Sequence, residues 1–345
     1  MSGDILLDDN GEALREPGLF KSVKGIGWFI DEYGIAQISY NLTNINISPL
    51  HLVFEKTCER AVIRGMRVTG SELIGLVPKK VLVDAGKYFL SKQGRSIGIP
   101  EIEIIKIAIK SLGLNELSPF NPSERIIEYI LDSNKDQPLI NMTLNNFANE
   151  TSSESPAPGG GSISAYCGAM GVALGTMVAN LSAHKRGWDD KWEKFSDWAE
   201  KGIVFQNQLL NLVDEDTKAF NNIMYAFRLP KDSKLDKEIR NREIQKATKF
   251  AILTPYSVMK TAYESMHIMK AMVEFGNPNS ITDAGVGALC ARTAVMGAFL
   301  NVKINCCDYQ DKLFVKDILQ KGEELVKKTQ ILEDEILKIT NNNIN

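Results

Sequence analysis

The sequence is poor in the residues that most often hold a metal or form a disulfide. Its 345 residues include three histidines and five cysteines, and no two cysteines have the Cys-x-x-Cys spacing. So few ligands argue against a zinc site, and an odd number of scattered cysteines argues against a disulfide framework. We therefore expect free thiols, no metal and a reducing, cytoplasmic compartment.

An excess of charge of one sign is also lacking. The chain has 40 Lys and Arg residues against 43 Asp and Glu residues, a net charge of −3. This balance argues against a nucleic-acid-binding protein that works by neutralising phosphates. The first residues, 1–4, have neither a basic segment nor an apolar core, so no signal peptide is visible. Apolar residues make up 44% of the chain, which excludes global disorder.

One segment is long and apolar enough to require a membrane test. No charged residue occurs between 155 and 183, and about 20 apolar residues can span a bilayer. Serine, threonine, asparagine and glycine residues dilute this run, however. A helix that is apolar on all sides is buried either in lipid or in protein. We favour a buried helix of a soluble domain and expect no membrane partner.

Secondary-structure signals divide the chain into two domains. Two apolar runs around Gly34 predict a β-hairpin in residues 25–47, and residues 68–76 predict a further strand. Helical periodicity follows each of these segments. We therefore expect an α+β domain in residues 1–133 and a polar linker at 134–138. Its helices are predicted at 49–64, 78–90 and 101–112.

The second domain, residues 139–345, is predicted to be all-α because strand signals almost vanish after the linker. A short helix is predicted at 139–148. Long helices are predicted at 162–183, 189–227, 235–253, 256–275, 283–305 and 311–340.

A loop rich in serine, proline and glycine precedes the most apolar helix. Gly159, Gly160 and Gly161 allow the backbone to approach a ligand closely. Ser162 can cap the helix, and the free amides at a helix N-terminus bind anions. A carboxylate or a phosphate fits such a site, although the loop lacks the lysine of a P-loop. The alternative is a flexible hinge with a serine cap.

Asp216 lies on the apolar face of an otherwise amphipathic helix. It shares the i, i+3, i+4 stripe of Leu209, Val213 and Phe220, whereas Asp214 falls off this stripe. Burial raises the pKa of a carboxylate, which suits general acid/base catalysis near neutral pH. The alternative is a carboxylate bonded to a helix N-terminus or to an arginine.

Two further signals are weaker. Phe20, Lys21 and Ser22 lie beside two glycines and combine an aromatic ring with a cation, which could hold a planar anion; a solvated strand edge is the favoured alternative. Arg292 lies inside an apolar helix and needs a partner, for which Asp216 or a substrate carboxylate are candidates.

Several longer segments carry a resemblance over residues 17–340. They are SVKGIGWFIDEYGIAQISYNLTNI, RVTGSELIGLVP, LGLNELSPFNPSERIIEYIL, SESPAPGGGSISAYCGAMGVALGTMVANLS, LVDEDTKAFNNIMYAFRLPK and GNPNSITDAGVGALCARTAVMGAFLNVKIN. In these segments the sequence resembles the bifunctional folate enzymes of the formiminotransferase-cyclodeaminase family, in a bacterial-like form. The resemblance implies an α/β sandwich, the C-terminal subdomain of a formiminotransferase, followed by a helical-bundle cyclodeaminase domain.

The resemblance also implies a reaction and its residues. The family's cyclodeaminase converts 5-formiminotetrahydrofolate into 5,10-methenyltetrahydrofolate and ammonia, a step of histidine degradation that needs no metal. By resemblance Asp216 is the acid/base, with Asp214 as the neighbour that could be confused with it. Residues 20–22 match a folate-contacting segment, and glycines 159–161 match a loop that faces the folate. The tetrahydrofolate substrate is expected to carry a polyglutamate tail.

The chain begins where the second transferase subdomain of the family begins, and none of its histidines matches the family's catalytic histidine. We therefore expect a complete cyclodeaminase and half of a glutamate formimidoyltransferase, the other half being lost, carried by a separate chain or truncated from the sequence. The resemblance also implies a homo-oligomer built from dimers. The alternative is a non-catalytic folate-binding or scaffold subunit that needs a separate chain with the catalytic subdomain.

Overall fold

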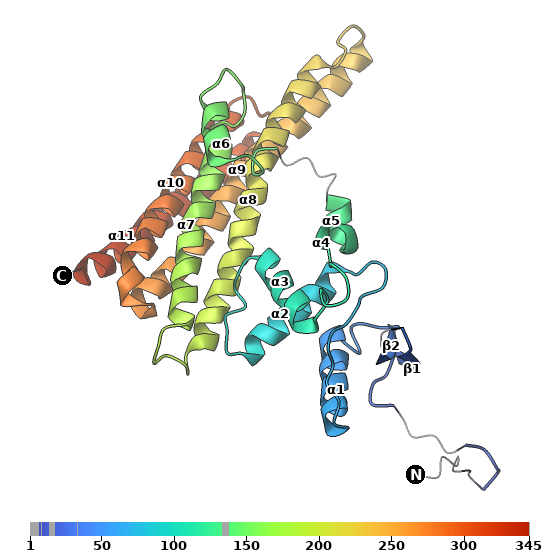
Figure 1. Ribbon diagram of the computed structural model, residues 1–345. Helices are drawn as coiled ribbons and strands as arrows, with labels where there is room; N and C mark the ends of the chain where they lie inside the picture. Colours follow the sequence, from blue (N-terminus) through green and yellow to red (C-terminus); the bar gives the residue numbers. More distant parts are fainter. Residues whose placement is uncertain (1–6, 8, 14–17, 33, 133–137, 345) are drawn as a thin grey trace. The chain divides into compact units, whose positions relative to one another are not determined.

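A computed structural model describes the chain except residues 1–6, 8, 14–17, 33, 133–137 and 345. Helices dominate, and the sheet found among the described residues has two strands (Figure 1). The chain divides into two compact units. The first consists of residues 1–89 and 104–133, and the second of residues 90–103 and 134–345.

The first unit contains the predicted hairpin. Strands β1 (Val23–Ile30) and β2 (Ile35–Leu42) pair antiparallel, from Val23 opposite Leu42 to Ile30 opposite Ile35. Apolar side chains of the following helices form its core, among them Leu82, Ile105 and Leu112. These helices are α1 (Leu50–Ile63), α2 (Lys79–Lys92), α3 (Glu101–Leu112), α4 (Pro122–Arg125) and α5 (Ile127–Asp132).

The strand predicted at residues 68–76 is wrong, because this segment is an irregular connection. Gly75 has a φ of +80°, which interrupts an extended strand. Gly70 packs so closely on the turn after α3 that an added Cβ would lie 2.6 Å from the Cβ of Glu116. The segment therefore packs against the turn after α3 instead of joining the sheet.

The second unit is helical, as predicted. Its helices are α6 (Leu144–Thr151), α7 (Gly160–Ala183), α8 (Trp192–Arg228), α9 (Lys234–Phe275), α10 (Ile281–Cys306) and α11 (Lys312–Asn342). Helix α7 packs against α8, α9 and α10, and its small residues allow close contacts. The Cβ that Gly171 lacks would lie 2.6 Å from the carbonyl oxygen of Gly287 in α10.

Two helices are long and apolar enough to cross a membrane by length and composition alone: α7 and the segment Pro278–Cys306. In their most apolar windows, 61% and 50% of the residues are buried inside the unit. At least half of each window therefore already has protein neighbours, which is the packing expected of core helices.

The break predicted between 253 and 256 is wrong, because α9 continues through Pro255. A proline inside a helix leaves the carbonyl four residues earlier without its amide donor. Here that carbonyl belongs to Ala251, and it accepts a hydrogen bond from Asn305 Nδ2 of α10 at 2.7 Å. The side chain replaces the missing backbone donor, so the long helix is kept.

The connection between α2 and α3 belongs to the helical unit. The amide of Ile97 donates to Ser196 Oγ at 2.9 Å, and the carbonyl of Gly98 accepts from Asn180 Nδ2 at 2.8 Å. Gly98 lies so close to α8 that an added Cβ would be 2.3 Å from the backbone of Ala199. This connection is therefore an integral part of the packing around α7 and α8.

Candidate functional site

The glycine-rich loop leads directly into α7, which begins at Gly160. Its N-cap residue, Gly159, offers no side chain to the free amides of the first turn. The expectation that Ser162 caps the helix is wrong, because the helix begins before it and Ser162 lies inside the first turn. Its hydroxyl instead donates to the carbonyl of Val213 in α8 at 2.9 Å.

Asp216 of α8 supplies the missing cap. Its Oδ2 accepts the amide hydrogen of Ser162 at 2.9 Å and lies 3.1 Å from the Ser162 hydroxyl. A Cβ at position 161 would lie 2.1 Å from Asp216 Oδ1. Gly161 is therefore required for this carboxylate to reach the helix N-terminus, and the two sequence-predicted motifs form one site.

The carboxylate of Asp216 has two different oxygens. The hydrogen bonds made to it by the described residues all end on Oδ2. Burial raises the pKa of Asp216, and the hydrogen bonds from Ser162 partly oppose this effect. The same contact caps α7, so the geometry combines a capping role with a carboxylate that can accept or donate a proton through Oδ1.

Asp214 is more deeply buried than Asp216, with 2% of its surface exposed. The expectation that it lies off the buried face is wrong, because the segment that opens the helical unit covers this side of α8. Its two oxygens accept the amides of Leu139 and Ile140 at 3.0 and 3.4 Å. Asp214 therefore holds the segment at residues 139–140 against α8 by hydrogen bonds, whereas Asp216 faces the glycine-rich loop.

Two polar side chains near this site were missed by sequence reasoning. A Cβ on Gly160 would lie 3.3 Å from Nδ2 of Asn301, so this amide of α10 borders the first turn of α7. The Oγ1 of Thr217 is buried and has no hydrogen-bond partner among the described residues. The signal that could have found Asn301 is its polar side chain in a mostly apolar helix.

The expected pairing of Arg292 with Asp216 is wrong, because the partner of Arg292 lies in α11. Its guanidinium pairs with Glu333 of α11, whose side chain is 2% exposed. The pair joins α10 to α11 and neutralises a carboxylate that would otherwise be isolated in the core.

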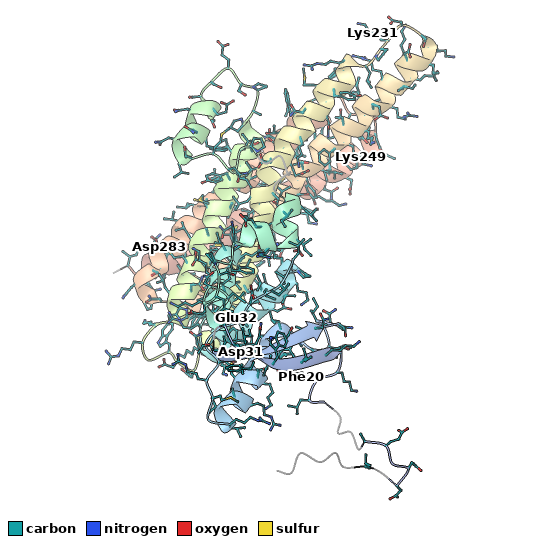
Figure 2. All side chains as sticks on the ribbon, turned by 45° about the vertical axis from the view of Figure 1, so that its right-hand side comes forward. Phe20, Asp31, Glu32, Lys231, Lys249 and Asp283 are labelled. Carbon is teal, nitrogen blue, oxygen red and sulfur yellow. The ribbon has the colours of Figure 1, made fainter. Side chains whose placement is uncertain are left out.

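Of the predicted trio in the first unit, Phe20 lines a cavity of about 590 Å³ between the hairpin and α1. Figure 2 labels Phe20 beside the strands. Lys21 and Ser22 do not line this cavity. The carbonyl of Ser22 accepts the amide of Thr43 at 2.9 Å, so this residue holds the base of the hairpin. Of these three residues, Phe20 therefore lines the cavity, whereas Ser22 stabilises the hairpin.

Among the described residues no group of three or more His, Cys, Asp or Glu side chains could hold a metal ion. Lys231 lies at the tip of the α8–α9 pair, which projects beyond the neighbouring helices of the second unit (Figures 1 and 2).

Comparison with known proteins relates this geometry to a family. The family model described as formiminotransferase-cyclodeaminase matches residues 143–324, which is more than half of the chain. The chain belongs to the formiminotransferase-cyclodeaminase family. A second model, the formiminotransferase domain, matches residues 5–132. The capped start of α7 and Asp216 thus lie within the matched cyclodeaminase region, and the Phe20 cavity lies within the matched transferase region.

Individual relatives match the chain to different extents. The formimidoyltransferase-cyclodeaminase of Gallus gallus is 35% identical over 323 residues, covering 93% of this chain and 60% of that protein. The methenyltetrahydrofolate cyclohydrolase of Methylorubrum extorquens is 32% identical, covering 59% of this chain and 99% of that protein. A crystal structure of formiminotetrahydrofolate cyclodeaminase from Thermotoga maritima has a TM-score of 0.54 at 26% identity and covers 60% of this chain and 99% of that one.

The chain therefore spans about 60% of the length of the bifunctional relative, but it matches nearly all of the proteins that consist of the helical region alone. Because of this difference, the chemistry proposed for this chain is that of its helical unit.

Proposed function

We propose that the helical unit is a formimidoyltetrahydrofolate cyclodeaminase of histidine degradation. The observation that carries the proposal is the Asp216 carboxylate, which is held at the glycine-rich start of α7 by Oδ2 and makes no hydrogen bond to the described residues through Oδ1. The match of residues 143–324 to the family supports the assignment. The substrate is 5-formiminotetrahydrofolate, which we expect to carry a polyglutamate tail, and the reaction requires no metal.

The reaction is an intramolecular cyclisation. N10 attacks the formimino carbon, and ammonia leaves to give the 5,10-methenyl bridge. Because both nitrogens belong to one molecule, the protein mainly has to hold a conformation in which they are close. Asp216 Oδ1 accepts the proton that N10 loses and returns it to the departing amine. Such proton transfer contributes about 10²–10⁴-fold to the rate.

A second candidate function is hydrolysis of 5,10-methenyltetrahydrofolate, the activity named for the Methylorubrum extorquens relative. There a water would attack the same carbon, and the same carboxylate could accept its proton. The match of residues 5–132 to the formiminotransferase domain favours the cyclodeaminase, because a transferase supplies a formimino group. A non-catalytic scaffold is disfavoured, because the relatives that match the helical region are named as enzymes.

We also propose that the first unit is an α/β sandwich of the formiminotransferase type, whose hairpin packs against a further transferase subdomain. Ile26 and Phe29 of β1 are 67% and 59% exposed. An isolated two-stranded hairpin is at best marginally stable in water, so it needs further strands or helices.

An exposed apolar stripe on α7 and α10 supports a homo-oligomer built from dimers. Its members are Ile163, Met170, Met177, Leu181, Leu289, Met296 and Leu300, each at least 37% exposed. Exposed apolar side chains that recur on one face of a helix are typical of a protein interface. We propose a cytoplasmic location, which the five free cysteines support.

The experiment compares wild-type protein with Asp216→Asn and Glu215→Gln. Asparagine keeps a carbonyl acceptor for the Ser162 amide and removes the titrating group, whereas Glu215 pairs with Lys218 on the surface of the same helix. Each protein receives 5-formiminotetrahydrofolate or 5,10-methenyltetrahydrofolate, and absorbance of the methenyl product or substrate is followed.

A cyclisation rate that falls at least about 10²-fold in Asp216→Asn, and not in Glu215→Gln, supports the proposal. Hydrolysis of the methenyl compound without cyclisation would establish the cyclohydrolase instead. Full cyclisation by Asp216→Asn would refute the role of this carboxylate.

A further inference from the structure

Asn301 of α10 lies beside the first residues of α7. A Cβ on Gly160 would lie 3.3 Å from its Nδ2 and 3.9 Å from its Oδ1, so the whole amide group borders this glycine. The side chain is half-buried. Gly161, the next residue of the same turn, is bordered by the carboxylate of Asp216. Two polar groups from different helices therefore meet consecutive glycines at the start of α7.

One hydrogen bond fixes which end of the amide is free. Nδ2 of Asn301 donates to the carbonyl of Gly297, one turn earlier in α10, at 3.0 Å. The amide oxygen has no hydrogen to share with a carbonyl, so the nitrogen must occupy this side. Among the described residues no hydrogen bond ends on Oδ1 of Asn301. This oxygen is therefore left to accept a hydrogen bond from a ligand.

The backbone does not require the hydrogen bond that Asn301 makes. Asn305, one turn later, supplies the carbonyl of Ala251 with the donor that Pro255 removes. The carbonyl of Gly297, by contrast, lies inside a continuous helix and has the backbone amide of Asn301 as its helical partner. Asn305 thus has a structural task that Asn301 lacks, and a half-buried polar side chain without one points to a ligand.

A second polar contact holds this turn of α7 against α10. Ser164, 6% exposed, donates its hydroxyl hydrogen to the carbonyl of Gly160 at 2.6 Å. A Cβ on Gly297 would collide with the oxygen of this hydroxyl, so the glycine makes room for it. Asp216 holds the same turn against α8. The carboxylate and the amide are therefore kept in place by packed helices before a substrate binds.

The two groups are close enough to contact one small molecule. Each lies within contact distance of the Cβ position of its own glycine. Because consecutive Cα atoms are about 3.8 Å apart, the carboxylate of Asp216 and the amide of Asn301 are separated by no more than about 12 Å. A pteridine that carries a formimino group can therefore contact both.

We propose that Asn301 binds the leaving nitrogen of the substrate: its Oδ1 accepts a hydrogen bond from the terminal nitrogen of the formimino group, while Asp216 serves N10. The inference rests on the proposed function, because it takes 5-formiminotetrahydrofolate as the substrate. The formimino group is an amidine, which is protonated near neutral pH and carries two hydrogens on this nitrogen. It thus offers a charged donor to an acceptor that has no other partner among the described residues.

This hydrogen bond orients the leaving group. When N10 attacks, the double bond from carbon to the terminal nitrogen becomes single, and that nitrogen becomes an amine with a lone pair. Asp216 takes the proton that N10 loses and transfers it to the lone pair. The bond from carbon to this nitrogen then breaks, ammonia leaves, and the positive charge of the formimino group passes to the methenyl bridge. By holding one amine hydrogen, Asn301 directs the lone pair toward the carboxylate.

The test compares two ligands that differ in one group. 5-Formyltetrahydrofolate has a carbonyl oxygen where the substrate has its terminal nitrogen, so it cannot donate this hydrogen bond or release ammonia. The full chain is assayed for cyclisation with the formyl compound as a competitive inhibitor, so that its inhibition constant reports only the site of cyclisation. The variants are Asn301→Leu, which keeps the volume, Asn301→Ala, which does not, and Lys303→Gln, a control at an exposed position of α10.

We expect both Asn301 variants to lower kcat/KM for the formimino substrate about ten- to a hundredfold, the effect of losing a hydrogen bond to a charged group. The inhibition constant of the formyl compound should stay within about twofold, because its oxygen makes no such bond. Lys303→Gln should change neither value. A packing role would instead be satisfied by leucine, and thermal unfolding shows whether each variant keeps its fold.

An equal loss of affinity for both ligands would overturn the inference, because it would show a structural role. Full activity of Asn301→Leu would overturn it as well. If both Asn301 variants cyclise normally while Asp216→Asn does not, this inference is refuted and the proposed function stands. A wild-type protein that does not cyclise the formimino compound would refute the proposed function and this inference together.

Discussion

Gly161 is the residue whose replacement tests the candidate site most directly. An alanine Cβ at this position would lie 2.1 Å from Asp216 Oδ1 and 2.5 Å from its Cγ. Ordinary contact begins near 3.4 Å, so the carboxylate must withdraw by more than 1 Å. The backbone of Gly161 is helical and needs no positive φ, so the substitution acts through this contact alone.

The expected loss follows from two opposing effects. Replacing glycine by alanine in a helix normally stabilises it by up to about 1 kcal/mol. Withdrawal of Asp216 removes its hydrogen bonds to Ser162, each worth about 1 kcal/mol, and leaves a buried amide without its acceptor, at about 1–3 kcal/mol. We expect Gly161→Ala to lower the free energy of unfolding by about 1–2 kcal/mol and the cyclisation rate by about 10²-fold.

Denaturant unfolding and the cyclisation assay measure the two effects. Gly160→Ala is the matched control, because its Cβ would meet the Asn301 amide at 3.3 Å, a contact that a shift of a few tenths of an ångström relieves. In an Asp216→Ala background the obstruction is absent, and Gly161→Ala should become neutral or stabilising. An equal loss of stability in both backgrounds, or full activity of the single variant, would refute the reasoning.

Three further predictions concern buried charges. Burial raises the pKa of Asp216, so the stability that its protonated form contributes is complete below the unfolded pKa and is lost as pH rises through the native pKa. In calorimetric scans Asp216→Asn should therefore unfold at an equal or higher temperature than wild type near pH 8. This difference should shrink toward pH 4. Asp214→Ala leaves one buried and one partly buried backbone amide without acceptors and should cost about 2–4 kcal/mol in denaturant unfolding, and unchanged stability would contradict the anchoring role. Arg292→Met should lower the free energy of unfolding by about 3 kcal/mol or more, because it leaves the Glu333 carboxylate, 2% exposed, without its partner. Glu333→Gln should cost less, because the arginine it leaves unpaired is 34% exposed. Equal unfolding midpoints of the two variants would contradict this.

The secondary structure was most predictable where local signals were sufficient. The apolar runs around Gly34 predict the hairpin, and helix α3 begins and ends at the residues expected from its periodicity and its terminal glycine. The strand expected at 68–76 and the break expected before Pro255 are wrong because each outcome depends on a distant partner. For Pro255 this partner is Asn305, fifty residues later in the chain.

The candidate site was partly predictable for the same reason. Helical periodicity identifies Asp216 as a carboxylate on an apolar face, and the glycines at 159–161 identify a place of close approach. Periodicity could not show that these two features meet, nor that Asp214 is the more buried carboxylate, because both facts depend on the segments that cover α8.

By itself, the sequence determined the helical character of the second unit, the hairpin of the first and the two motifs that make the site, since all of these follow from residue spacing along one element. Only the tertiary structure decided which oxygen of Asp216 is bonded, that Glu333 neutralises Arg292, and that Asn301 of α10 borders the first turn of α7. The physical reason is that hydrogen bonding, burial and ion pairing depend on which distant segments lie within a few ångströms, and local spacing does not contain that information.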